Sequence, residues 1–129
     1  MPFDGRTFGR HADMLDKLAL ATDLLRTEGQ WCKQELKTID GRRCILGALM
    51  HVGANARLGG VILGAVRELT GKSYRGIESF NDAPHTTHRL VVAVLERSRE
   101  NILLGKVPAP PMTVERRVRS FYAALARTG

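Results

Sequence analysis

The stretch CILGALMHVGANARLGGVILGAV, residues 44–66, decides what kind of fold this chain can adopt. Its length is that of a membrane-spanning helix, and the glycines of GVILG have the spacing of closely packed helices. His51, Asn55 and Arg57 interrupt the run, however, and an arginine near the centre of a bilayer is costly. We therefore expect two soluble helices, over about 43–53 and 55–70, that meet at GANAR, and no membrane partner.

The sequence on either side of this stretch predicts further helices. One covers about 12–28, after a loose arm at 1–11, and its apolar face steps by four, three and four residues: Met14, Leu18, Ala21 and Leu25. Another begins after Thr86 or Thr87, which are both favourable N-cap residues, and ends near residue 104. These segments extend the helical pattern over most of the chain.

The C-terminal segment predicts one more helix with a basic side. Residues 105–112 form a proline-rich connector, and 114–127 have the period of an amphipathic helix. Its apolar residues are expected to pack on the core domain or on a second copy of the chain, which would give a homodimer. The other side of the helix carries four arginines: Arg116, Arg117, Arg119 and Arg127. Such a face is typical of contact with phosphates or with an acidic protein surface, although an ordinary solvated face has the same pattern.

Together these segments predict a mainly α-helical protein, a single compact bundle of about five helices. Segments 32–39 and 74–80 are short enough to be strands, so a minimal two-stranded element is left open. We divide the chain into a helical core domain, 1–104, and a second part, 105–129, that holds the connector and the basic amphipathic helix.

The composition restricts the classes of protein that this chain can belong to. It has 129 residues with 43% hydrophobic content, which is enough for one core. Twenty Lys and Arg against thirteen Asp and Glu give a net charge of +7, which favours anionic partners. There are only two cysteines, Cys32 and Cys44, and no secretory signal precedes them. We therefore expect a cytoplasmic protein with free thiols, and a Cys32–Cys44 disulfide is the less favoured alternative.

Cys44 is the first candidate for chemistry. A thiol in the first turn of a helix, directly after Arg42 and Arg43, is predicted to have a lowered pKa and to form a thiolate. A nucleophilic cysteine also needs a base, which His85 or His88 would supply. The alternative interpretation is that Cys44 is a small core residue in a tight helix start. No catalytic signature flanks it, so we favour the structural role and leave an enzymatic one open.

The loop between Phe80 and His88 is the second candidate. Asn81 and Asp82 are typical of side chains that bind backbone amides in turns, and Thr86 of a capping residue. We expect Asn81 and Asp82 to fasten this loop to the beginning of the Cys44 helix, with Trp31 at the edge of the core. The alternatives are that Asn81 and Asp82 line a pocket facing Cys44, where either would orient a histidine base, or that Asp82 binds a metal with His85 and His88.

Neither a metal nor a cofactor is predicted from the motifs in this chain. The two histidines of HTTH lack the HExxH spacing of a zinc enzyme. The sequence contains neither the glycine-rich loop of dinucleotide-binding proteins nor a phosphate-binding P-loop. Only 5% of the residues are aromatic, so the stacking surfaces that single-stranded nucleic acids need are scarce.

The order of these motifs resembles an uncharacterised family of small bacterial and phage-encoded proteins. The resemblance covers about 12–103 and is carried by a Trp-Cys pair, a G-x-x-C-x-x-G-A-L motif, an aromatic-Asn-Asp motif and a Pro-x-Thr motif: Trp31, Gly41, Cys44, Gly47, Ala48, Leu49, Phe80, Asn81, Asp82, Pro84 and Thr86. Arg43 departs from the pattern, because an aromatic residue is common before the cysteine. The resemblance implies the order of the elements and no established activity.

The sequence thus predicts a small basic regulatory or binding module that contacts an anionic partner, either an acidic protein surface or a nucleic-acid backbone. The binding residues would be the four C-terminal arginines together with Arg42 and Arg43. The alternative is a small cysteine-dependent enzyme in which Cys44 acts with His85 or His88.

Overall fold

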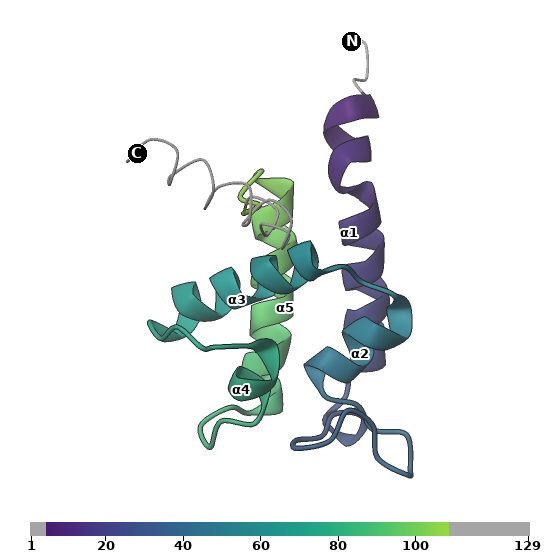
Figure 1. The fold of residues 1–129 in the computed structure, drawn as a ribbon, viewed down its shortest axis with the longest axis vertical. Coiled ribbons are helices and arrows are strands. Elements are labelled where there is room, and N and C mark those ends of the chain that lie inside the picture. Colours follow the sequence, from purple (N-terminus) through teal and green to yellow (C-terminus); the bar gives the residue numbers. More distant parts are fainter. Residues whose placement is uncertain (1–4, 109–129) are drawn as a thin grey trace, which may run out of the picture.

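Five α-helices form the part of the chain that the structure describes (Figure 1). The structure is a computed structural model, and it describes the backbone of residues 5–108 and the side chains of residues 11–108. The helices are α1 (Gly5–Leu24), α2 (Ile45–Val52), α3 (Ala56–Thr70), α4 (Ile77–Asn81) and α5 (His88–Leu103), and a short 3-10 turn covers Glu28–Gln30. The prediction of a mainly α-helical bundle of about five helices is confirmed.

The helices enclose one apolar core. α3 crosses α5, α1 packs against both α2 and α5, and α4 closes the end of the bundle beside α2 and α3 (Figure 1). The predicted buried face of the first helix is confirmed, because Met14, Leu18, Ala21 and Leu25 are each 5% exposed or less. The largest fully buried side chain is Phe80 of α4, which joins this short helix to the core.

Local signals in the sequence set where the central helices begin and end. α2 stops at Gly53, whose φ of 74° is the left-handed conformation that glycine adopts easily. Asn55 then caps α3, since its Oδ1 accepts a hydrogen bond from Leu58 N at 3.1 Å. Of the two predicted caps for the last described helix, Thr87 is the one used, with its Oγ1 accepting from Leu90 N at 3.2 Å. The two helices predicted to meet at GANAR do so.

Two predicted boundaries are wrong, and the structure decides one alternative that the sequence leaves open. α1 begins at Gly5, inside the segment predicted to be a loose arm, and ends at Leu24 rather than near residue 28. A capping box between Thr27 and Gln30 starts a separate turn just beyond that end. The segment 74–80 is not a strand, because α4 occupies most of it.

The segment 32–39 pairs within its own loop and not with residues 74–80. Arg43 forms isolated bridges with Trp31 and with Lys37. Cys32 N donates to Arg43 O at 3.0 Å, and Thr38 N donates to Arg42 O at 2.8 Å. The loop 31–43 therefore makes many of its backbone hydrogen bonds within itself or with its flanking residues, and it needs no strand at 74–80 as a partner.

The predicted C-terminal helix, 114–127, and its four arginines lie outside the described residues. Its packing on the core or on a second copy stays a prediction. Within residues 5–108, each helix is too short or too polar to cross a membrane.

Candidate functional site

Asn81, at the end of α4, joins three segments of the chain through its side-chain amide. Its Oδ1 accepts hydrogen bonds from Trp31 Nε1 at 2.8 Å and from Ile45 N at 3.1 Å. Its Nδ2 donates to Cys32 O and to Asp82 Oδ1, each at 3.0 Å. The side chain is fully buried, and both donors and both acceptor positions of the amide are in use. We call these five residues the Asn81 junction.

The loop after α4 is held by further hydrogen bonds to the loop 31–43. Asp82 Oδ1 accepts from Gln34 N at 2.7 Å, where Gln34 has a left-handed φ of 68°. Lys33 Nζ donates to Ala83 O at 2.7 Å. Asn81 therefore reaches the beginning of the Cys44 helix, as the sequence predicts, whereas Asp82 holds the preceding loop instead.

Thr86 and Trp31 lie where the sequence predicts, although Thr86 has a different task. Thr86 is buried and its Oγ1 donates to Phe80 O at 2.6 Å, so it ties the loop to α4 and does not cap α5. Trp31 is half-buried against the core, with Lys33 Nζ 5.6 Å from the centre of its ring.

Cys44 is a helix-capping residue inside the core. It is 4% exposed and precedes α2, and its Sγ accepts a hydrogen bond from Gly47 N at 3.2 Å. The predicted lowering of its pKa is wrong: burial raises the pKa of the Cys44 thiol and outweighs the backbone hydrogen bonds from Gly47 and Leu46. A thiol of this kind carries little thiolate at neutral pH.

The two candidate histidines do not serve this thiol. His88 Nε2 lies 2.6 Å from Leu25 O, and His85 is exposed. Among the hydrogen bonds of the described residues, none joins Cys44 to a histidine. The side chains of residues 11–108 also contain no group of three or more His, Cys, Asp or Glu residues that could hold a metal ion. Cys32 and Cys44 are both free thiols.

The packing around Gly47 explains why a glycine follows Cys44 by three positions. A Cβ atom added at Gly47 would lie 1.9 Å from the backbone oxygen of Leu36, which is far inside any real contact. Leu36 O also accepts from Cys44 N at 3.3 Å, so the loop 31–43 lies directly against the start of α2. The motif residues around Cys44 and Asn81 thus share one task, which is to hold this loop and α4 onto α2.

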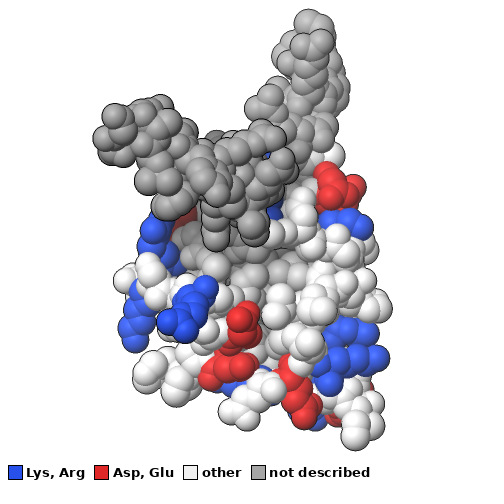
Figure 2. Space-filling model, viewed as in Figure 1, with Lys and Arg blue, Asp and Glu red and all other residues white. Residues whose placement is uncertain are grey.

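Arg42 and Arg43, two of the predicted binding residues, lie in different surroundings. Arg42 Nε lies 3.1 Å from Asp40 Oδ2, so a carboxylate offsets its charge. Arg43 is half-buried, with its backbone in the two bridges of the loop. Figure 2 shows basic and acidic side chains interspersed over the face that it presents.

A cleft of about 420 Å³ lies where α3 faces the end of α5. No pattern in the sequence predicts it. Gly60 and Gly64 of α3 line it, together with Tyr74. Glu68 and Asn101 supply polar groups, and Arg67, Lys106 and Pro108 complete the lining.

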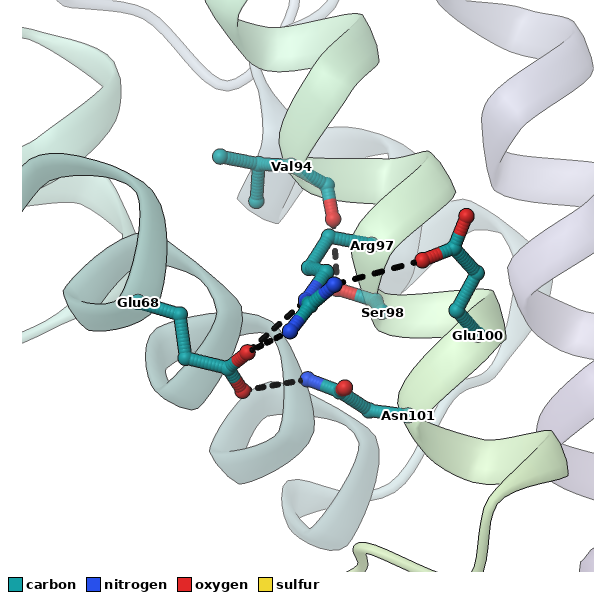
Figure 3. A network of polar contacts seen from close by, with 6 residues as sticks. All are labelled: Glu68, Val94, Arg97, Ser98, Glu100 and Asn101. Atoms are coloured by element: carbon teal, nitrogen blue, oxygen red, sulfur yellow. Dashed lines mark hydrogen bonds and ion pairs between the residues drawn. The ribbon is translucent and has the colours of Figure 1, made fainter.

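Glu68 and Asn101, which line this cleft, belong to a network of polar contacts between α3 and α5 (Figure 3). Arg97 Nε and Nη2 lie 2.7 Å and 2.6 Å from Glu68 Oε2, and Asn101 Nδ2 donates to Glu68 Oε1 at 2.7 Å. Arg97 also reaches Glu100 Oε2 at 3.4 Å. The hydrogen bond from Arg97 holds the pKa of Glu68 below its usual range, with smaller contributions from Asn101 and from the charge of Lys106. Glu68 is therefore an anion at neutral pH, and it shares the charge of Arg97 with Glu100.

Asn101 is the unusual member of this network. It is 3% exposed, and its Oδ1 is a buried acceptor without a hydrogen-bond partner. Turning the amide over would not help, because the Glu68 carboxylate can only accept and so requires Nδ2 on its side. One signal in the sequence could have drawn attention to it: Ser98 and Asn101 interrupt the apolar face of α5, and buried polar groups of this kind need an explanation.

The comparisons with known proteins identify the family and no activity. The model of DUF6197, a family of unknown function, matches residues 10–101. The chain belongs to this family. The DUF6197 match contains the whole Asn81 junction and most of the cleft, and it ends before Lys106 and the C-terminal arginines. It agrees with the predicted resemblance to an uncharacterised family. No curated protein and no solved structure matches the chain.

Proposed function

We propose that this protein is a small binding module that contacts the phosphate backbone of a nucleic acid. The observation that carries the proposal is the charge around the cleft of α3. Arg67 and Lys106 lie on its rim, and none of the ion pairs between described residues includes either of them. Glu68, the acidic residue beside them, shares Arg97 with Glu100, so this group leaves one negative charge against the two positive charges of Arg67 and Lys106. The rim therefore carries an excess of positive charge.

The C-terminal segment supports the same proposal from the sequence. It follows Pro108, which itself lines the cleft, and it contributes four arginines: Arg116, Arg117, Arg119 and Arg127. Guanidinium groups bind phosphate oxygens through paired hydrogen bonds, and each contact releases counterions from the nucleic acid. A duplex fits better than a single strand because aromatic residues are scarce. An acidic protein surface is the competing partner that the experiment below tests.

Two further parts of the proposal concern the cellular compartment and the source of the protein. Both thiols are free, which suits a reducing compartment, and we assign the module to the cytoplasm. The resemblance of its motifs suggests a bacterial or phage-encoded protein. The alternative of a cysteine-dependent enzyme gains no support from Cys44, whose thiol is buried and has a raised pKa.

The experiment measures binding of a labelled DNA duplex and a labelled RNA duplex by fluorescence anisotropy, at low and at moderate salt. We expect affinity to fall linearly with salt on a log–log scale. The double variant Arg67→Glu/Lys106→Glu and the triple variant Arg116→Glu/Arg117→Glu/Arg119→Glu should each bind more weakly. Each lost phosphate contact should also reduce the slope by about one.

The matched control is Arg99→Glu. Arg99 is exposed on α5 and lines a different groove, beside α1, so this variant reverses a charge away from the cleft. It should bind almost as the parent does. Equal losses for Arg99→Glu and for Lys106→Glu alone would mean that only net charge matters. No binding by the intact chain at low salt would refute the nucleic-acid proposal and favour an acidic protein partner.

A further inference from the structure

We propose that Cys32 and Cys44 form a redox pair, in which a low-molecular-weight disulfide such as oxidised glutathione converts the two thiols into one reversible intramolecular disulfide. Both thiols are free in the structure, which is the reduced state of this pair. The pair lies at the base of the loop 31–43, and its chemistry does not depend on the binding of a nucleic acid.

The backbone places the two cysteines side by side. Trp31 and Arg43 form a parallel bridge, so Cys32 and Cys44 are the next residues in the same register. Cys32 N donates to Arg43 O at 3.0 Å, which keeps the two segments together as far as the cysteines. Extended segments paired in this way lie about 4.8 Å apart, and residues in register project to the same side. Disulfides span Cα separations of roughly 4.4–6.8 Å, so this register suits one.

Asn81 holds the same two segments together from α4. Its Nδ2 donates to Cys32 O at 3.0 Å, and its Oδ1 accepts from the N–H of Ile45, the residue after Cys44, at 3.1 Å. One buried side-chain amide therefore binds the backbone beside both cysteines. A fixed separation raises the effective concentration of one thiol at the other, which favours an intramolecular bond over a bond to a free thiol.

The two cysteines also contact the same short piece of the loop. Cys32 Sγ donates to Glu35 O at 3.3 Å, and Cys44 N donates to Leu36 O, also at 3.3 Å. The electrostatics agree with this proximity: burial raises the pKa of Cys32 most, and the charge of Cys44 is the next cause. Because the pKa of each thiol is raised, the pair lacks the stabilised thiolate that makes the disulfides of strong oxidants easy to reduce.

The exchange has two steps because the two thiols differ in access. Cys32 is partly exposed and Cys44 is 4% exposed, so Cys32 meets the small disulfide first. Its thiolate attacks one sulfur of oxidised glutathione, the S–S bond of that molecule breaks, and one glutathione leaves as a thiolate that takes up a proton. The thiolate of Cys44 then attacks the Cys32 sulfur of the mixed disulfide, and the second glutathione leaves in the same way. Two electrons and two protons pass from the protein to glutathione, which gives one protein disulfide and two molecules of reduced glutathione.

The experiment equilibrates the intact chain with mixtures of reduced and oxidised glutathione. Free thiols are then counted by alkylation and mass spectrometry, and peptide mapping identifies the bond. The same measurement in concentrated urea gives the equilibrium constant for the unfolded chain. We expect the constant for the Cys32–Cys44 bond to be at least tenfold larger in the folded chain, because the fold holds the thiols together only there. By linkage, the oxidised chain should unfold at a higher urea concentration than the reduced chain.

The matched variant is Cys32→Ser/Lys33→Cys, which moves one thiol by a single residue. The length of the closed loop is almost unchanged, but position 33 projects to the opposite side of its segment from position 32. The constant should be at least tenfold lower than that of the parent when both chains are folded, and the two should agree in urea. Cys44→Ala removes the second thiol and should stop at the mixed disulfide between Cys32 and glutathione.

Three results would overturn the redox pair. The first is an equal constant in the folded and the unfolded parent chain. The second is a parent chain that stops at the mixed disulfide on Cys32, which would show that Cys44 does not reach it. The third is an equal constant for the parent and for the Cys32→Ser/Lys33→Cys variant when both are folded, since closeness along the sequence would then explain the bond without the register.

Discussion

Replacing Asn81 with leucine should be among the most damaging single changes in this chain. Leucine has a similar volume, so the main loss is four hydrogen bonds. The N–H of Ile45 is buried and would incur the full cost of a missing partner, about 1–3 kcal/mol. The hydrogen bonds to Trp31 and to the carbonyl of Cys32 are partly buried, so losing each of them should cost less free energy. The bond to Asp82 should cost the least. We expect a total loss of about 3–5 kcal/mol, a large part of the ~5–15 kcal/mol that stabilises a typical domain.

The assay is urea unfolding followed by circular dichroism and by the fluorescence of the single tryptophan, Trp31. A slope of about 2 kcal/mol per molar urea would move the midpoint down by roughly 2 M. Asn101→Leu is the matched control, because it removes a second buried asparagine whose amide has one hydrogen-bond partner, Glu68, and an unpaired oxygen. It should cost less than about 1 kcal/mol. Equal losses for the two variants, or an Asn81→Leu midpoint near that of the parent, would refute the reasoning.

Four further predictions follow from the start of α2 and from the cleft. Gly47→Ala should lose at least about 3 kcal/mol or fail to fold, because its Cβ meets the backbone of the loop 31–43; a normal urea midpoint would show that the loop can move away. Cys44→Ser should keep more stability than Cys44→Ala in the same assay, since a serine hydroxyl can accept the Gly47 N–H as the sulfur does, and the reverse order would mean that burial of the hydroxyl dominates. A thiol reagent should label Cys32 before Cys44. Because both pKa values are raised, both labelling rates should continue to rise above neutral pH as the thiolates form; faster labelling of Cys44 at neutral pH would favour the enzymatic alternative. Because the pKa of Glu68 is lowered in the folded state, its contribution to stability is present at neutral pH and is lost as the pH falls through its folded-state pKa. Glu68→Gln should therefore lose less stability than the parent when the pH is lowered, and an unchanged dependence of stability on acidic pH would contradict this.

The parts of the fold that could be predicted were those with a local signal. The apolar steps of α1 and the cap of α5 depend on residues close together in the sequence, and the structure contains both. α4 was missed because a helix of five residues has too few turns to show a period. A strand at 74–80 was left open because Phe80 is aromatic, and aromatic residues are frequent in strands.

The candidate site was predictable only where sequence neighbours decide the outcome. Asn81 was expected to bind backbone amides near α2 and does, but the partner of Asp82, Gln34, is 48 residues away and no local pattern points to it. The pKa of Cys44 was expected to fall because its helix start is visible in the sequence, whereas the burial that raises the pKa is a property of the folded core. The cleft lies between α3, α5 and the residues after them, so it exists only once these elements are packed.

The Asn81 junction also has a consequence for the order in which the chain folds. Three of its four hydrogen bonds connect residues 36 to 50 positions apart, so a long loop must close before these three can form. The helical turns of α1 and α3 need no such closure and can form early. We therefore expect the junction to be made after the rate-limiting barrier, where its bonds slow unfolding and leave the folding rate almost unchanged. Asn81 and Asp82, which the sequence offers as a candidate site, would then slow unfolding and set the lifetime of the folded protein.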